Sequence, residues 1–142
     1  MKLFFALFIV VLSLTTNVFA DEYVVLVNEK NPIKEFTAAE VSQILLANKT
    51  DWQDGKRIFL INYDYESIYA ENIFKNYAGM SGLQAKKNYL TKVFNGVLQK
   101  QPLTYESLDE IIDRVSENPQ AIAVVVMPSK VSNSKIKVLK IH

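Results

Sequence analysis

The stretch LLANKTDWQDGKRIFLINYDYESIYAENIF, residues 45–74, decides the fold class of this protein. It starts with the end of a helix and crosses a polar loop that carries the only tryptophan, Trp52. After a turn signal at Asp54-Gly55, the apolar run RIFLI at 57–61 predicts a short buried strand. A helix is expected next, from about residue 66 to 78. In an α/β protein, the end of a strand that leads into a helix is a natural place to hold an anion.

On both sides of this stretch, apolar runs alternate with helix signals. YVVLV at 23–27 and AIAVVVM at 121–127 are continuous apolar runs, which indicate strands covered on both faces. The run KIKVLKI at 135–141 partly alternates Lys with apolar residues, as edge strands do. Three capping boxes predict helix starts at Thr37–Glu40, Ser81–Gln84 and Ser107–Glu110.

The resulting order is β-α-β-α-α-α-β-β, with residues 101–105 as a connector around a proline. Strands separated by helices predict an α/β protein with a mostly parallel sheet of about four to five strands flanked by helices. Gly79 is suited to end the helix at 66–78. Apolar residues repeat at helical spacing in two predicted helices: Ile68, Ile73, Phe74 and Tyr77 in the helix at 66–78, and Leu83, Leu90, Val93 and Phe94 in a helix at about 82–95.

The amino-terminal end of the chain has the pattern of a secretory signal peptide. Lys2 supplies a positive charge, residues 3–14 are almost entirely apolar, and Val18 and Ala20 suit the −3 and −1 positions of a cleavage site. We therefore predict a signal peptide at 1–20, a single domain at 21–142, and export to the periplasm. The alternative is an uncleaved membrane anchor, but the apolar run is shorter than the ~20 residues that a membrane-spanning helix needs.

The composition excludes several classes of function. Without Lys2, the 16 basic residues become 15 and match the 15 acidic ones, so the overall charge gives no reason to expect nucleic acid as a partner. There is no cysteine, and the only histidine is His142. This makes a metal site or a nucleophile–histidine pair a poor interpretation. No glycine-rich nucleotide motif is present. We therefore predict a protein that is not an enzyme, with no cofactor and no metal; a hydrolase is a weaker alternative.

Several landmarks in order resemble a known family. They are the strand at 24–28 followed by Asn31-Pro32, the stretch TAAEVSQILLANK at 37–49, WQDGKRI at 52–58, FKNYAG at 74–79, Tyr89, Phe94-Asn-Gly96, Pro102 and SENPQAIAVV at 116–125. Together they are similar to the short, single-lobe relatives of the substrate-binding component of bacterial phosphate ABC transporters. The resemblance covers residues 22–141. It implies a single three-layer lobe of the periplasmic-binding-protein-like type.

The resemblance also implies a ligand and a site. Family members bind a small solute, typically an oxyanion, and hold phosphate with a Ser/Gly/Thr-rich helix start and an Arg after the second strand. The expected partners are a small oxyanion or other polar solute and an ABC permease or membrane sensor. We place the binding surface at the carboxyl ends of the first two strands. The candidate ligand-binding residues are Asn28, Asn62, Tyr63, Asp64, Ser67 and Tyr69.

The candidate loop departs from the family pattern. Residues 62–69 contain one serine and no glycine, and no basic residue lies between Arg57 and Lys75. Asp64 and Glu66 would repel an anion by more than a helix dipole attracts it, since two charges about 4 Å apart interact by roughly 4 kcal/mol at a surface-like dielectric constant and a dipole contact contributes ~0.3–1 kcal/mol. The oxyanion cradle is therefore expected to be degraded.

The degraded cradle leaves a second interpretation open. Tyr63, Tyr65 and Tyr69 suit a polar organic ligand or a protein surface. In this interpretation the chain is an accessory module that binds no small solute. It docks instead on a membrane sensor, on a porin or on a second copy of itself to form a homodimer. Trp52 is interpreted as a packing anchor, and Arg57 and Arg114, the only arginines, as surface residues.

Overall fold

The structure is a computed structural model that describes residues 22–142. The predicted signal peptide and its cleavage site lie outside these residues. Nine elements follow one another along the described chain: β1 (Tyr23–Asn28), α1 (Ala38–Leu45), β2 (Phe59–Tyr63), α2 (Ile68–Ala78), α3 (Gly82–Phe94), β3 (Leu103–Tyr105), α4 (Leu108–Glu117), β4 (Ala121–Val126) and β5 (Ile136–Lys140).

The five strands form one sheet in the order β3-β2-β4-β1-β5. β2 is parallel to β3 and β4, whereas β1 is antiparallel to both of its neighbours, β4 and β5. Four strands therefore run in one direction and β1 alone runs the other way. The predicted α/β class is confirmed, and the last strand is at an edge as predicted; two of the four strand pairings are parallel and two are antiparallel. Because β4 lies between β1 and β2, α1 does not connect adjacent parallel strands, and the usual crossover rule does not set the direction of β1.

The segment predicted as a connector contains β3, which is a correction to the sequence analysis. Residues 103–105 pair in parallel with β2, with Ile61 opposite Leu103 and Tyr63 opposite Tyr105. Three residues are too few to display a strand period, and Pro102 directly before them favours a turn. The strand therefore exists because β2 offers it an open edge, which no local pattern indicates.

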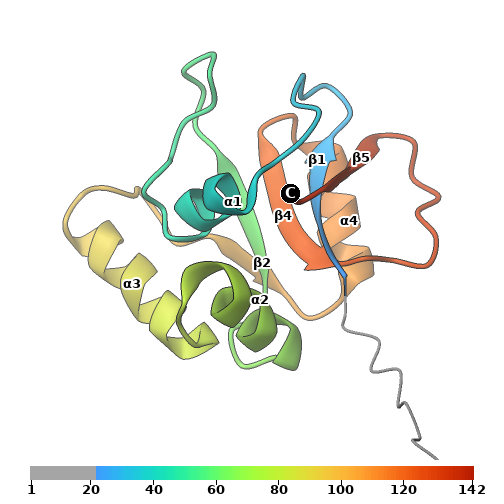
Figure 1. Cartoon of the computed structure of the whole chain (residues 1–142). Coiled ribbons are helices and arrows are strands. Elements are labelled where there is room, and N and C mark those ends of the chain that lie inside the picture. Colours follow the sequence, from blue (N-terminus) through green and yellow to red (C-terminus); the bar gives the residue numbers. More distant parts are fainter. Residues whose placement is uncertain (1–21) are drawn as a thin grey trace, which may run out of the picture.

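Helices cover both faces of the sheet (Figure 1). α4 lies on one face, where Ile111 and Val115 are completely buried, and it contacts all of the strands. α1 and α2 lie on the other face and contact each other, and α3 packs outside them against α2. This is the predicted three-layer lobe. The helices of the described part of the chain are all too short or too polar to span a bilayer.

α3 turns a different face to the protein than its apolar spacing suggests. Its buried residues are Gly82, Ala85 and Tyr89. Leu83, Leu90 and Phe94 are 53%, 45% and 92% exposed. The small residues let α3 approach its neighbours closely, and Tyr89 fills the space between α1 and α2. The regular apolar stripe therefore faces solvent.

The helix ends follow the sequence closely. Thr37, Ser81 and Ser107 are N-caps whose hydroxyls accept hydrogen bonds from the backbone three residues on, and Ser81 forms a complete capping box with Gln84. Gly79 ends α2 with a φ of 65°, the left-handed conformation that glycine adopts without strain. Ile68, expected on the inner stripe of α2, is instead 63% exposed at the first turn.

Candidate functional site

The predicted loop at 62–69 joins the carboxyl end of β2 to the start of α2, as the sequence indicates. The turn at its centre is built around Asp64. The Asp64 N–H donates to the Tyr105 carbonyl (3.0 Å), and the Asp64 carbonyl accepts from the Ser67 N–H (3.0 Å). The Asp64 carboxylate accepts from the Glu66 N–H (3.1 Å). Asp64 therefore shapes the loop through both its backbone and its side chain.

Ser67 is the N-cap of α2. Its hydroxyl accepts a hydrogen bond from the Ala70 N–H (3.1 Å), and its carbonyl accepts from the Glu71 N–H (3.1 Å). An α-helix leaves its first N–H groups without partners inside the helix. Ser67 satisfies the N–H groups of Ala70 and Glu71, so the N–H groups of Ile68 and Tyr69 remain available to donate to an acceptor at the loop.

The charge around these N–H groups is negative. Asp64 and Glu66 lie in the loop itself, and none of the ion pairs in residues 22–142 includes either of them. The nearest cation along the chain, Lys75, is bound to Glu71 at 3.1 Å. The positive end of α2 is therefore opposed by two carboxylates that no ion pair of the described residues neutralises.

Two of the candidate tyrosines stack on each other. The rings of Tyr63 and Tyr69 lie 5.0 Å apart at 30°. Tyr63 is buried, whereas Tyr69 is 46% exposed. Burial raises the pKa of Tyr63 to about 12, a hydrogen bond with the Val126 backbone partly offsets this rise, and the nearby Tyr69 adds to it. Tyr69 is thus the aromatic face that a ligand or partner at this loop would meet.

Asn62 and Tyr65 point into the protein. Both are buried, and Tyr65 packs with Phe74 and Tyr89 at ring distances of 6.3 and 6.0 Å. Burial raises the pKa of Tyr65 to about 12, and Asn62 is close enough to its hydroxyl to lower that pKa slightly. In the described structure, the Asn62 amide nitrogen and the Tyr65 hydroxyl make no hydrogen bond of ordinary length. Asn62 and Tyr65 therefore pack in the protein interior below the loop and are not available at its surface.

Asn28 does not join the other candidates. Val27 of β1 and Leu60 of β2 are both opposite Ile122, so β1 ends level with the beginning of β2. The expected grouping of Asn28 with residues 62–69 is therefore not formed, because β1 runs against the other strands. The Asn28 amide donates to the carbonyls of Val115 (2.9 Å) and Ser116 (3.1 Å), which ties β1 to the end of α4.

Three residues that shape the loop were missed by the sequence analysis as site residues. The Gly82 N–H donates to the Glu71 carboxylate (2.9 Å), and a Cβ on Gly82 would lie 2.2 Å from the Tyr65 carbonyl oxygen. The hydroxyl of Tyr89 donates to the Leu45 carbonyl of α1. One sequence signal was available, since a glycine directly after an N-cap serves no turn and therefore points to a close approach of two backbones.

No family model matches the sequence. No curated protein matches it either. Solved structures do match. An ABC-type phosphate transport receptor from Vibrio cholerae is 17% identical, with a TM-score of 0.63 over 85% of this chain and 46% of that one. A putative phosphate ABC transporter substrate-binding protein with bound phosphate, from Clostridium perfringens, is 15% identical, with a TM-score of 0.62 over 85% of this chain and 45% of that one.

A possible phosphate-binding protein from Planctomyces limnophilus is 20% identical, with a TM-score of 0.57 over 86% of this chain and 42% of that one. The chain spans less than half the length of each of these proteins. Its fold is similar to one part of these larger proteins, a lobe of the periplasmic-binding-protein-like type. The predicted fold class is thereby confirmed.

Proposed function

We propose that the chain is an exported solute-binding-protein-like lobe that serves a transporter of the phosphate ABC type. The observation that carries the proposal is the match of the fold to phosphate-binding transport proteins over 85% of the chain. The role is binding rather than catalysis. It is carried out in the periplasm once a signal peptide has been removed, and the permease of an ABC transporter is the protein partner.

The proposed contact for the solute is the loop at 62–69. Ser67 and the N–H groups of Ile68 and Tyr69 face the solute with the positive end of α2 behind them. The Asp64 carboxylate accepts a hydrogen bond from the O–H of a partly protonated oxyanion, and the exposed ring of Tyr69 packs against the solute. The missing cations make this a degraded oxyanion cradle, so a small polar solute of low charge fits it better than phosphate.

Calorimetry tests this proposal with phosphate and sulfate as the reference ligands. The protein is expressed from the full chain and purified, and a thermal-shift panel of small polar solutes is run alongside. We expect weak phosphate binding that becomes at least roughly tenfold tighter in the double variant Asp64→Asn, Glu66→Gln, because removing two carboxylates removes their repulsion. Ser67→Ala is expected to weaken binding.

Ser107→Ala is the matched control, because it removes the same kind of N-cap from α4, away from the loop. Phosphate binding that responds equally to both serine substitutions would reflect stability rather than contact. If neither heat nor a thermal shift is observed with any solute, for the protein or for the double variant, solute binding by this lobe alone is wrong.

A second candidate function is favoured by the surface of α3. Leu83, Leu90 and Phe94 are spaced by seven and four residues, so they share one helix face, and all three are exposed. Exposed apolar residues on one face are typical of a contact with another protein. We propose an accessory module that docks through this face on a membrane sensor, a porin or a second copy of the chain. Sedimentation that gives a monomer for both the protein and Phe94→Ser would contradict the self-association form of this candidate.

A further inference from the structure

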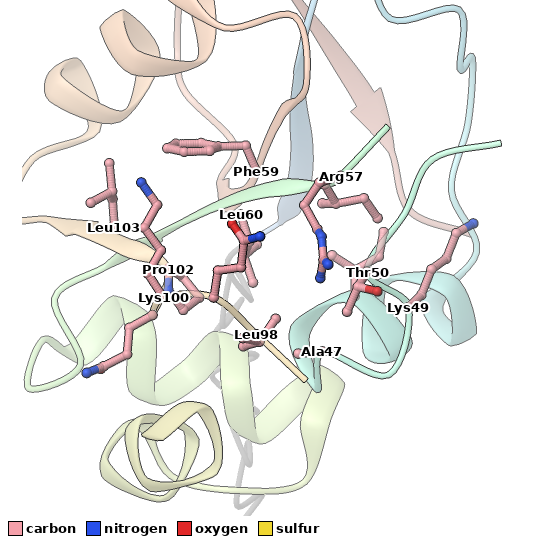
Figure 2. Close-up of a pocket in the computed structure, with 14 residues that line it drawn as sticks. Ala47, Lys49, Thr50, Arg57, Phe59, Leu60, Leu98, Lys100, Pro102 and Leu103 are labelled. Atoms are coloured by element: carbon pink, nitrogen blue, oxygen red, sulfur yellow. The ribbon is translucent and has the colours of Figure 1, made fainter. Parts of the chain in front are cut away.

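A pocket of about 110 Å³ opens between the end of α1, the beginning of β2 and the segment at 98–103 (Figure 2). It lies at the amino end of β2, whereas the loop at 62–69 follows the carboxyl end of the same strand. The two sites are therefore separate. An inference about the pocket goes beyond the proposed function and does not require the loop to bind anything.

The wall of the pocket is largely apolar. Ile44 and Ala47 contribute from the end of α1, Leu60 from β2, and Leu98 and Pro102 from the segment before β3. The volume is below that of the 150 Å³ apolar cavity that holds benzene, so it suits an alkyl group of about four or five carbon atoms. A free phosphate or sulfate ion has no apolar part to place there.

The ionisable groups that line the pocket are all cations: Lys49, Arg57 and Lys100. Figure 2 shows the Arg57 side chain directed into the space between Thr50 and Leu60. A pocket with an apolar wall and only positive charges at its rim suits a ligand with an alkyl body and one anionic end.

Arg57 is held in place and keeps donors free. Its Nη1 donates to the Val97 carbonyl (3.3 Å), and its Nε lies 3.6 Å from the Asp51 carboxylate in a half-exposed pair. Asp51 does not line the pocket. A guanidinium group has five N–H donors in a planar fork, so the remaining donors match the two oxygens of a carboxylate. Lys100 Nζ, 5.3 Å from the centre of the Phe59 ring, adds positive charge at the same rim.

We propose that this pocket binds a short-chain monocarboxylate, with its alkyl group against Leu60 and Leu98 and its carboxylate on Arg57. A branched alkyl group of four carbons matches the volume. Longer chains exceed the pocket, and dicarboxylates would place a second charge against the apolar wall.

Calorimetry of the protein expressed from the full chain tests the proposal with 3-methylbutanoate as the probe. Acetate lacks the branched alkyl group, and 3-methylbutan-1-ol lacks the charge. We expect saturable binding of 3-methylbutanoate and at least tenfold weaker binding of both analogues. Arg57→Gln is expected to weaken the binding of 3-methylbutanoate roughly 10- to 100-fold, the range for a lost charge-assisted hydrogen bond. The affinity for 3-methylbutan-1-ol should be unchanged.

Arg114→Gln is the matched control. Arg114 is the only other arginine and forms an exposed pair with Glu117 on α4. Leu98→Phe fills the pocket, leaves the Arg57 charge in place and is expected to abolish binding of 3-methylbutanoate. This variant keeps the test decisive if Arg57→Gln is unstable. Binding that survives both Arg57→Gln and Leu98→Phe, or no saturable binding below about 10 mM, overturns the proposal. A phosphate affinity that changes with Ser67→Ala but not with Arg57→Gln reports on the loop at 62–69 alone. The proposal for the loop and the proposal for the pocket are therefore tested independently.

Discussion

Gly82→Ala is expected to destabilise the protein, although alanine is the better helix former. Gly82 is the first residue of α3, and a Cβ there would lie 2.2 Å from the Tyr65 carbonyl oxygen. That oxygen belongs to the backbone of the loop at 62–69, so α3 or the loop must move by about 1 Å to restore an ordinary contact. Overpacking of this kind costs about 1–3 kcal/mol. The same movement weakens the hydrogen bond from the Gly82 N–H to the Glu71 carboxylate, at 2.9 Å.

Alanine regains at most about 1 kcal/mol of helix propensity, so we expect a net loss of about 1–3 kcal/mol in the free energy of unfolding. Urea unfolding followed by Trp52 fluorescence and by circular dichroism measures this loss. Gly55→Ala is the control, since nothing lies within 4 Å of its added Cβ and its φ is 84°; its expected cost is the ~1–2 kcal/mol of left-handed strain alone. Stability of Gly82→Ala equal to or above that of the parent protein would refute the close approach of α3 to the loop.

Three further predictions concern stability. Asn28→Ala removes two hydrogen bonds to the end of α4 and is expected to lower the free energy of unfolding by about 2 kcal/mol, measured in urea; a neutral result would contradict the structural role given to Asn28. Burial raises the pKa of both Tyr63 and Tyr65 to about 12, so the protein should lose stability as the pH rises from about 10, the unfolded value, through 12. Absorbance titration at 295 nm should show Tyr63, Tyr65, Tyr77 and Tyr89 ionising later than the other tyrosines, because burial raises the pKa of all four, and ordinary titration of every tyrosine in the folded protein would contradict this. Phe94→Ser should change stability by less than about 0.5 kcal/mol because Phe94 is 92% exposed, whereas Tyr89→Phe should cost about 1 kcal/mol in the same denaturation assay.

Elements defined by local chemistry could be predicted from the sequence. The N-caps at Ser81 and Ser107 and the glycine at 79 fix helix ends through hydrogen bonds within a few residues, and each is found where expected, although only Ser81 also forms the full capping box. The apolar runs that became β1 and β4 are long enough to identify without knowing their partners. Such features depend on neighbours in the chain, which is the information that a single sequence contains.

Features that depend on distant partners could not be predicted in the same way. The direction of β1 is set by pairing with β4 and β5, and it moved Asn28 to the far end of the sheet. The inner face of α3 is set by how closely Gly82 and Tyr89 approach other elements, although Leu83, Leu90 and Phe94 are the larger apolar residues. The pocket beside Arg57 combines three segments that are separate in the sequence, so no motif marks it.

The geometry of the loop at 62–69 also limits what it can bind. Asp64 and Ser67 use side-chain oxygens to build the turn and the first turn of α2. A ligand that displaced them would uncover backbone N–H groups at a cost of about 1 kcal/mol or more for each cap. The N–H groups of Ile68 and Tyr69 can donate hydrogen bonds to a ligand without that cost, but the carboxylates of Asp64 and Glu66 oppose a full negative charge more strongly than a helix end attracts it. A neutral polar solute, or a protein group that brings a carbonyl oxygen to α2, therefore fits this loop better than an oxyanion. The double variant Asp64→Asn, Glu66→Gln tests this, because it should tighten the binding of an oxyanion much more than that of a neutral ligand.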